Sequence, residues 1–282
     1  MPQWYPGHMA KTKRLIKEVL PLADAVIELL DARAPKSSRN ADIPAIIGGK
    51  RHIIVFNKYD LADEAQSARW KRFYEKGGAF VVFANCLTGD GVNEIEKAVR
   101  NAVADKVAAQ KARGRLTVTI RAMVLGVPNV GKSSLINRYA KKARAKTEDR
   151  PGVTRSLQWI KVKNDFEILD TPGILPPKFA TEREGLTVAF TGGVKDSVTD
   201  TFSIANELVK FLAENYPANI SSRYNVSAEA LSEDGLEKIA LSRGYLLSGG
   251  KPDVTRCAVM VLDEFRAGKI GRVTLDLLDN ND

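Results

Sequence analysis

Residues 126–133 read Gly126-Val127-Pro128-Asn129-Val130-Gly131-Lys132-Ser133 and match the pattern G-x-x-x-x-G-K-[ST] at every fixed position. An apolar run, residues 117–125, precedes them, and a helix-forming run that starts at Ser134 follows. A strand that passes through a glycine-rich loop into a helix is the arrangement that cradles phosphate groups. A chance match in a chain of this length is expected about once in a hundred. The stretch therefore predicts a phosphate-bearing ligand, with ATP and GTP both open at this point.

The polar residues of this loop have expected tasks. Lys132 should reach the β- and γ-phosphates, and Ser133 should hold Mg²⁺. The two glycines let the backbone approach phosphate oxygens, and the first N–H groups of the helix point at the anion. We expect the phosphates to be bound by residues Asn129, Val130, Gly131, Lys132, Ser133 and Ser134.

Composition indicates a globular protein with a polyanionic partner. The chain has 282 residues, 44% of them hydrophobic, and a net charge of +9. No apolar run approaches membrane-spanning length and the N-terminus shows no signal pattern, so we expect a cytoplasmic protein without a membrane partner. The charge favours nucleic acid, although solvated helix faces are the alternative for any one cluster. Basic residues gather at Lys11, Lys13, Arg14 and Lys17, at Lys106, Lys111, Arg113 and Arg115, and at Arg138, Lys141, Lys142, Arg144 and Lys146.

Strand-like and helix-like segments alternate through the first part of the chain. Apolar runs at 25–30, 52–56, 79–83 and 117–125 read as strands with helices between them, and 157–162 with 166–169 read as a hairpin. This pattern predicts an α/β fold with a mostly parallel sheet, whose ligands lie at the carboxyl ends of the strands. Helical stripes dominate from about residue 180. We therefore expect a nucleotide-binding domain over 1–178 and a smaller all-α domain over 179–282, with an acidic end, 276–282, that is frayed.

A second motif, Asn57-Lys58-Tyr59-Asp60, has the form N-K-x-D and follows the strand at 52–56. An aspartate at its end can accept hydrogen bonds from guanine N1–H and the 2-amino group, which adenine lacks. Taken alone, Asn and Asp after a strand more often only make a turn. In the same chain as a phosphate loop, Asn57, Lys58 and Asp60 predict selection of GTP. The backbone of Ala84, Asn85 and Cys86, after the next strand, is expected to touch the base.

A third motif, Asp170-Thr171-Pro172-Gly173, follows the strand at 166–169. It supplies what a γ-phosphate sensor needs, because Asp170 can lie near Mg²⁺ and the N–H of Gly173 can meet the terminal phosphate. Thr154 lies in the polar segment before it and is the candidate to give Mg²⁺ a second hydroxyl ligand, with a plain loop threonine as the alternative.

The order of the motifs is unusual. In most small GTPases N-K-x-D comes last, whereas here it stands at 57–60, before the phosphate loop at 126–133. The GTPase domain is therefore expected to be circularly permuted, which is tolerable because the termini of a domain often lie close together. In this order Gly173 leads directly into the helical tail. We expect the tail to act as the output lever of the switch.

With these motifs in this order, the chain resembles the circularly permuted ribosome-assembly GTPases of the RbgA/YlqF type over nearly its whole length. The resemblance also rests on Trp4 to Lys11, on Asp31-Ala32-Arg33-Ala34-Pro35, on Ser38-Arg39-Asn40 and on residues 265–272. It implies a GTPase that drives a late step of large (50S) ribosomal subunit assembly. Its implied partners are the subunit precursor, ribosomal proteins and rRNA, the last touched by the helical domain. Lys251, Arg256, Arg266, Lys269 and Arg272 are candidates for that contact, with ordinary solubilising residues as the alternative.

Catalysis needs a group that the third motif does not supply. Ile174 stands where Ras-like enzymes place the glutamine that orients the attacking water, and isoleucine cannot hydrogen-bond. The resemblance places a functional histidine at His8, with a structural histidine packed on Trp4 as the alternative. It also makes Asn129 a candidate ligand for K⁺. The expected catalytic set is His8, Lys132, Thr154 and Gly173. A nucleotide-gated RNA chaperone or scaffold with little catalysis is the competing hypothesis.

Overall fold

The computed structural model describes residues 8–144, 159–176, 179–194 and 200–278, with side chains left out at 8–11 and 141–144. Its centre is one six-stranded sheet with the strand order β3-β2-β1-β4-β6-β5. The strands are β1 (Ala25–Asp31), β2 (Arg51–Asn57), β3 (Phe80–Ala84), β4 (Ile120–Leu125), β5 (Trp159–Lys163) and β6 (Phe166–Leu169). Every neighbouring pair is parallel except β5 and β6, which form the predicted antiparallel hairpin. The predicted α/β fold with a mostly parallel sheet is confirmed.

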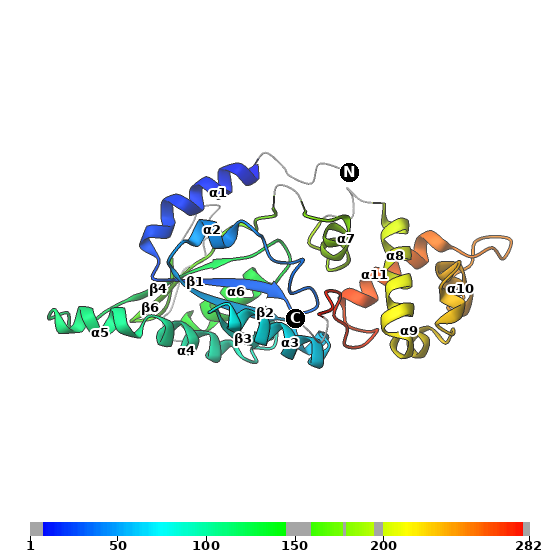
Figure 1. Cartoon of the computed structure of the whole chain (residues 1–282). Coiled ribbons are helices and arrows are strands. Elements are labelled where there is room, and N and C mark those ends of the chain that lie inside the picture. Colours follow the sequence, from blue (N-terminus) through cyan, green and yellow to red (C-terminus); the bar gives the residue numbers. More distant parts are fainter. Residues whose placement is uncertain (1–7, 145–158, 177–178, 195–199, 279–282) are drawn as a thin grey trace.

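Helices cover both faces of the sheet (Figure 1). Successive side chains of a strand point to opposite faces, so Ile27 and Leu29 of β1 pack with one set of helices and Val26 and Leu30 with others. The first face carries α4 (Val92–Ala102) and α6 (Lys132–Arg144), and the second carries α1 (His8–Val19), α2 (Ile43–Ile47) and α3 (Glu64–Lys76). Because β1 is covered on both faces, all seven of its residues are buried, which explains why all but Glu28 and Asp31 are apolar.

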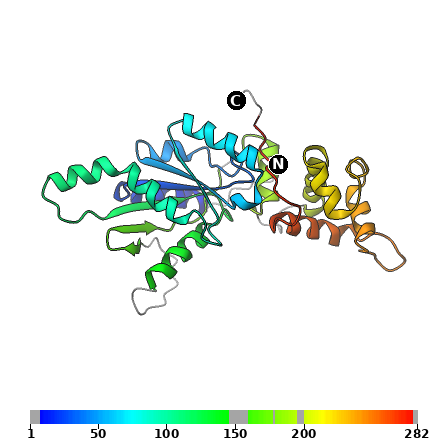
Figure 2. The ribbon, with the colours of Figure 1, turned by 90° about the horizontal axis from the view of Figure 1, so that it is seen from below.

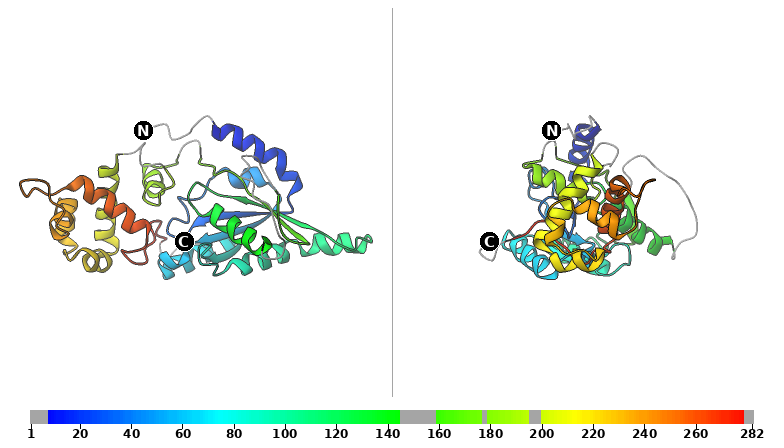
Figure 3. Two further views of the ribbon diagram at one scale, coloured as in Figure 1. Left: turned by 180° about the vertical axis from the view of Figure 1, so that it is seen from behind. Right: turned by 90° about the vertical axis from the view of Figure 1, so that its right-hand side faces the viewer.

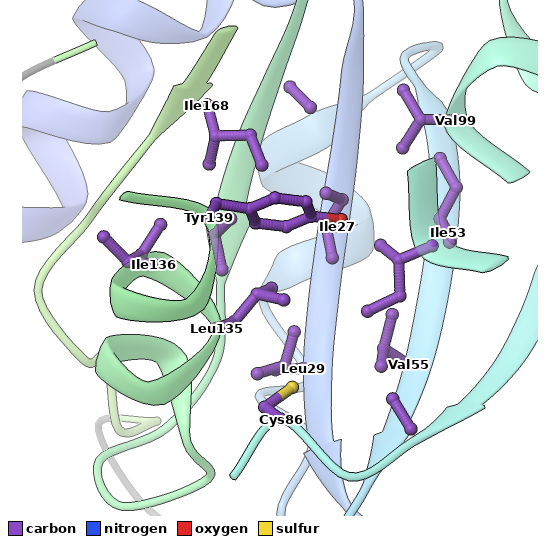
Figure 4. Packing of buried hydrophobic residues seen from close by; sticks show 14 of the residues in the cluster. Ile27, Leu29, Ile53, Val55, Cys86, Val99, Leu135, Ile136, Tyr139 and Ile168 are labelled. Atoms are coloured by element: carbon purple, nitrogen blue, oxygen red, sulfur yellow. The ribbon is translucent and has the colours of Figure 1, made fainter. Parts of the chain in front are cut away.

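The helix that follows the phosphate loop is fixed to the sheet by its apolar side. Figure 4 shows the Tyr139 ring of α6 extending towards Ile27 of β1, and Leu135 beside Leu29 of the same strand; all four belong to one apolar core. The buried Tyr139 hydroxyl donates to the carbonyl of Val92 at 3.0 Å, so this polar group is satisfied inside the core. The start of α6 therefore has a defined position relative to the ends of the strands.

The connection from α4 to β4 contains a helix of its own. This helix, α5 (Ala104–Ala112), continues from α4 beyond the sheet (Figures 1 and 2). Two short 3₁₀ turns, η1 (Leu20–Leu22) and η2 (Tyr59–Leu61), shape the entry to β1 and the exit from β2.

The tail is helical, as predicted. Its elements are α7 (Glu182–Phe190), α8 (Thr201–Asn215), α9 (Pro217–Tyr224), η4 (Glu229–Leu231), α10 (Gly235–Ser242) and α11 (Val254–Arg266). The expected stripes of α8 and α11 face each other in a separate apolar core, which holds Leu208, Leu212, Val261 and Phe265. Helix α7 belongs to both cores, because Val188 packs with the sheet and Phe190 with the helices.

The last described residues return to the sheet domain. Residues 272–278, the C-terminal strap, run back from α11 along α3 of the sheet domain (Figure 2). The N–H of Val273 donates to the carbonyl of Leu61 at 3.0 Å, and the N–H of Leu275 donates to the carbonyl of Arg33 at 2.7 Å. The expectation of a frayed end is therefore wrong for residues 276–278.

Asp276 explains why this end is held. Its buried carboxylate accepts hydrogen bonds from the backbone N–H of Lys36 at 2.8 Å and of Ser37 at 2.7 Å, and from the Ser37 hydroxyl at 2.6 Å. Burial raises the pKa of Asp276, and these donors act in the opposite direction. From the sequence alone, an acidic residue near a terminus is expected to be solvated. Here its carboxylate instead binds the backbone of a loop that is far away in the chain.

Cys86 and Cys257 are both free thiols, and each is buried in one of the two apolar cores. Among the helices that the structure describes, none combines the length and the apolarity that crossing a membrane requires.

Candidate nucleotide-binding site

The sequence motifs gather at one edge of the sheet. β2 ends at Asn57, β3 at Ala84, β4 just before Gly126 and β6 just before Asp170. Because these strands are parallel, their carboxyl ends lie side by side, which is where open α/β sheets bind ligands. The fold thus brings together the three motifs that the sequence separates.

The phosphate loop has a shape that only glycine permits at two positions. Gly126 has φ of 154° and Gly131 has φ of 101°, in the region that disfavours other residues. A Cβ at Gly126 would lie 2.5 Å from the carbonyl oxygen of Leu29, and one at Gly131 would lie 2.1 Å from Nδ2 of Asn57. The loop therefore lies directly on the ends of β1 and β2, and α6 starts at its rim with Lys132.

Lys132 is buried inside this loop. Its Nζ donates to the carbonyl oxygens of Gly126 at 3.0 Å and Val127 at 2.7 Å. Burial lowers its pKa to about 8, and the nearby Asp170 carboxylate acts in the opposite direction. A desolvated cation held only by neutral carbonyls gains when an anion arrives, so the loop fits a phosphate group.

Asp170 shows the complementary situation. It is half-buried, and its pKa is raised by burial while Lys132 counteracts the rise. Ser133 is exposed in the first turn of α6, with the half-buried Ser134 beside it. A partly desolvated carboxylate and a serine hydroxyl are the oxygen ligands that Mg²⁺ takes beside a bound triphosphate. Across the described ranges no three His, Cys, Asp or Glu side chains gather as a metal site.

The N-K-x-D motif touches the phosphate loop directly. Nδ2 of Asn57 donates to the carbonyl of Val130 at 2.6 Å, and Nζ of Lys58 donates to the carbonyl of Asn129 at 2.9 Å. Lys58 has φ of 59°, a left-handed conformation that turns the chain into η2, where Asp60 stays exposed. Segments about 70 positions apart in the chain therefore share one site, as the sequence predicted.

The turn after β3 completes this side of the site. Ala84 is the last residue of β3, and the N–H of Cys86 donates to Oδ1 of Asn57 at 2.8 Å. Oδ1 of Asn85 accepts from the N–H groups of Leu87 and Thr88, which shapes the turn. Burial raises the pKa of the Cys86 thiol to about 12, with Arg138 acting in the opposite direction, so this thiol stays protonated.

Asp31 is a site residue that sequence reasoning gave no role of its own. Its Oδ2 accepts from Nζ of Lys58 at 2.9 Å, and its two oxygens accept from Nε and Nη2 of Arg33 at 2.9 and 2.8 Å. Burial alone raises the pKa of Asp31, but Arg33 and Lys58 together outweigh it and hold the pKa well below its ordinary value. Asp31 therefore orients Lys58.

A signal for this role is present in the sequence. Asp31 ends β1 opposite Asn57 in the register of β1 and β2, so it lies beside the N-K-x-D motif. Arg33 also donates from Nη1 to the carbonyl of Phe265 at 3.1 Å, at the end of α11. The base-selecting corner is thus connected to the helical domain.

The third motif lies against the phosphate loop. A Cβ at Gly173 would lie 2.9 Å from the backbone nitrogen of Pro128 and 3.1 Å from Nζ of Lys132. The N–H of Ile174 donates to the carbonyl of Gly126 at 3.1 Å, and the Ile174 side chain is buried in the core. Ile174 therefore cannot orient a water molecule, and catalysis needs another group.

Three expected site residues remain to be described. Thr154 lies outside the described residues. His8 is the first residue of α1, which begins on the side of the sheet where the strands end (Figures 1 and 3), but its side chain lies outside the described part. Asn129 is exposed, and its Nδ2 donates to the carbonyl of Gly192, just after α7.

Known proteins share this arrangement. The profile of a family described as "50S ribosome-binding GTPase" matches residues 121–221. The chain is 44% identical to ribosome biogenesis GTPase A of Bacillus cereus, over 97% of this chain and 93% of that protein. It is 30% identical to the protein of the same name from Thermotoga maritima, again over 97% and 93%.

Solved structures agree. A GDP-bound YlqF matches with a TM-score of 0.70 and 28% identity, over 95% of this chain and all of that chain. A GNP-bound YlqF from T. maritima matches with a TM-score of 0.65 and 27% identity, over 95% and 98%.

The geometry and the relatives lead to the same conclusion. The strand that carries N-K-x-D precedes the strand that carries the phosphate loop, yet both serve one site, so the GTPase domain is circularly permuted. With relatives 44% identical over nearly its whole length, this chain belongs to the ribosome biogenesis GTPase A family and is a GTP hydrolase with a role in ribosome biogenesis.

Proposed function

We propose that this protein acts in the cytoplasm, where it binds and hydrolyses GTP to drive a late step of large (50S) ribosomal subunit assembly. The observation that carries the nucleotide part is the direct contact of Asn57 and Lys58 with the phosphate loop, at 2.6 and 2.9 Å. Because the two motifs are in contact, we expect one nucleotide to bind to both of them. Its base would lie beyond Lys58 and its phosphates over Gly131.

Each proposed site residue has a task in this scheme. Asp60 accepts from the guanine edge, and the backbone of Ala84, Asn85 and Cys86 borders the base. Lys132 leaves the carbonyls that now hold it and pairs with the β- and γ-phosphates. Gly173 donates its N–H to the γ-phosphate. Ser133, Thr154 and Asp170 would hold Mg²⁺, whose charge would offset the negative charge of the phosphates.

The attack of water needs help that Ile174 cannot give. We assign the orientation of water to His8, because α1 begins on the same side of the sheet as the strand ends (Figure 1). Asn129 is the proposed K⁺ ligand. The Nδ2 contact with Gly192 leaves the amide oxygen to face a cation, because the two ends of the amide point apart.

The proposed partners are the large-subunit precursor, its rRNA and ribosomal proteins. The net charge of +9 supports a polyanionic partner. Of the five tail cations considered, Lys251, Arg256 and Lys269 are exposed and suit rRNA contact. Arg266 and Arg272 serve the fold instead, because they donate to the carbonyls of Phe190 at 3.2 Å and Ala62 at 2.6 Å.

We also propose that the functional division of the chain lies between 178 and 179. The apolar core of the helices begins with Ala189, and α7 joins it to the sheet. On this division the strap, residues 272–278, belongs to the helical domain, and it fastens that domain to the GTPase domain.

Phosphate release with and without large-subunit precursor particles tests the function. We expect the particles to accelerate GTP hydrolysis roughly tenfold or more, as partners of other GTPases do, and the Lys132→Ala variant to lose it. His8→Ala should bind GTP normally and lose the acceleration. Particles that bind in a nucleotide-dependent way without accelerating hydrolysis would show the protein to be an RNA chaperone or scaffold.

Nucleotide selection has its own test. Calorimetry should show GTP binding at least tenfold more tightly than ATP, which is about 1.4 kcal/mol. The Asp60→Asn variant should lose much of that preference while keeping its affinity for the phosphates. Equal affinity of the wild type for ATP and GTP contradicts the assignment of residues 57–60.

A further inference from the structure

The connection between α4 and β4 is longer than the fold requires. α4 ends at Ala102 and β4 begins at Ile120, both at the edge of the sheet where the strands begin. Two ion pairs place the start of α5 at this edge, since Lys106 pairs with Asp24 before β1 at 2.5 Å and Asp105 with Arg51 of β2 at 3.7 Å. Helix-to-strand connections usually take about two to six residues. Residues 103–119 are therefore a longer connection than this fold requires.

Most of this connection projects from the molecule, and we name the projecting residues, 104–117, the arm. None of the residues of α5 is buried, and a helix of this length extends about 13 Å. Figures 1 and 2 show α5 running out beyond the sheet, at the end opposite the helical domain. A short helix that buries nothing gains little stability from its own hydrogen bonds, so the arm contributes little to the fold.

The arm has an unusual charge. From Lys106 to Arg144 the sequence has no Asp or Glu, while it has ten Lys and Arg residues. Several of these cations are engaged: Lys106 with Asp24, Arg121 with Glu167, and Arg138 with the carbonyl of Leu87. Lys111, Arg113 and Arg115 differ from them, because all three are exposed and no carboxylate of the described residues pairs with them.

Three neighbouring cations on a projecting element repel one another and do not stabilise the folded chain. A polyanionic surface would relieve this repulsion and release its own counterions. We infer that the arm is an RNA-binding element in which Lys111, Arg113 and Arg115 contact the phosphate backbone of structured RNA. This inference rests on the proposed ribosomal function, and it places a second RNA contact at the opposite end of the molecule from the helical domain.

RNA is favoured over a protein partner because the arm offers charge and little apolar area. Its side chains are mostly alanine and polar residues, and the one large apolar side chain at the tip is Leu116, which is 97% exposed. Protein interfaces have an apolar centre, whereas contacts to a phosphate backbone need mainly Lys and Arg.

The test uses the full-length protein loaded with a non-hydrolysable GTP analogue. Its affinity for purified large-subunit rRNA and for precursor particles is measured at several salt concentrations. The arm variant carries Lys111→Gln, Arg113→Gln and Arg115→Gln. The charge-matched control carries Lys71→Gln, Lys97→Gln and Lys163→Gln, because each of these cations already pairs with a carboxylate at 2.8 to 3.7 Å. A third variant, Leu116→Ser, removes the apolar tip.

We expect the arm variant to bind rRNA about tenfold or more weakly at low salt. The slope of log affinity against log salt should become shallower by about 2 to 3, since each phosphate contact contributes about 0.7 to 0.9. The control and Leu116→Ser should keep the wild-type slope, and all variants should keep the wild-type melting temperature and GTP affinity.

The outcomes separate the two hypotheses. If the wild type binds neither rRNA nor particles, the proposed ribosomal function fails. If the wild type binds and the arm variant keeps its slope, the arm inference is wrong while the function stands. An arm variant that loses affinity for particles but not for rRNA, or a loss caused by Leu116→Ser, shows that the arm binds protein and also overturns the inference.

Discussion

Asp31 shows how one buried residue holds the N-K-x-D motif in place. Its carboxylate is fully buried, and it holds Lys58 on one side and Arg33 on the other. Lys58 in turn donates to the phosphate loop at Asn129. A buried carboxylate is tolerated only with such partners, and each partner depends on it equally.

The Asp31→Asn variant should therefore be strongly destabilised. Removing the charge leaves the buried Arg33 guanidinium without a counter-ion, and breaking a buried pair costs about 3 to 5 kcal/mol. The pKa of Asp31 is depressed, so its stabilising contribution is complete above the ordinary value of 3.8 and is lost as the pH falls below that value. Urea unfolding should show a large difference from wild type at pH 6 and a smaller one at pH 3.

Asp165 provides the matched control for this prediction. It also accepts two hydrogen bonds from one arginine, here from Nη1 and Nη2 of Arg100 at 2.8 and 2.9 Å, whereas Arg33 uses Nε and Nη2. Its side chain is 47% exposed, so Asp165→Asn should cost less than about 1 kcal/mol. Equal losses in the two variants would mean that burial does not decide the strength of the Asp31 pair.

Gly131 is where the phosphate loop meets the N-K-x-D motif. The Gly131→Ala variant should lose GTP affinity by about a hundredfold or more, which is about 2.7 kcal/mol. The reason is that the new Cβ would lie 2.1 Å from Nδ2 of Asn57 and force the two motifs apart. Calorimetric titration with GTP measures the change.

The control for Gly131 is Gly114, in the loop after α5. It also has positive φ, 86° against 101°, but nothing lies within 4 Å of a Cβ placed there. Gly114→Ala therefore carries the conformational strain without the collision, and it should bind GTP as the wild type does. If both variants bind GTP normally, the contact between the motifs does not matter for affinity.

At the scale of elements, the sequence predicted the local structure well and the long-range contacts poorly. The strands at 25–30, 52–56 and 166–169 and the stripes of α8 and α11 follow from period and apolar runs, which are local properties. The gathering of Asn57 and Lys132 followed from parallel strands. The role of Asp276 could not be predicted, because its donors at Lys36 and Ser37 lie about 240 positions away. The acidic residues around it suggested solvent instead.

Removal of the C-terminal strap tests whether its long-range contacts stabilise the protein. A chain that ends at Gly271 loses the buried side chains of Val273 and Leu275 together with the bonds of Asp276. Burying two such side chains contributes about 3 to 5 kcal/mol. We expect a loss of that size in the free energy of unfolding, measured in urea.

A chain that ends at Leu278 is the control, because it keeps every described contact of the strap. Its stability should match that of the full chain within about 0.5 kcal/mol. A Gly271 truncation that is equally stable would show that α7 and the Arg33 contact with Phe265 hold the helical domain without the strap.

At the scale of the whole molecule, the helical domain is attached to both ends of the nucleotide site. At the base end, Arg33 donates to the carbonyl of Phe265, and the strap bonds to Leu61 and Arg33. At the phosphate end, the chain leaves Gly173 for α7, and Asn129 donates to Gly192. The base is the same in GTP and GDP, whereas the γ-phosphate is not. The first attachment is therefore constant through the cycle, and the second is the one that the nucleotide can change.

This asymmetry predicts where nucleotide exchange is felt. Hydrogen exchange compared between GDP and a non-hydrolysable GTP analogue should differ over α7 and residues 191–194, because these follow the γ-phosphate sensor and contact the phosphate loop. The strap and α3 should exchange equally in both states, since they attach at the base end. An ATP analogue, as control, should leave every segment as in the nucleotide-free protein. Equal changes over α7 and the strap would mean that the helical domain moves as a whole. No change over residues 180–278 would mean that this domain is not an output lever. Only a difference confined to α7 and residues 191–194 fits a lever that pivots on the corner formed by Asp31, Arg33 and Lys58.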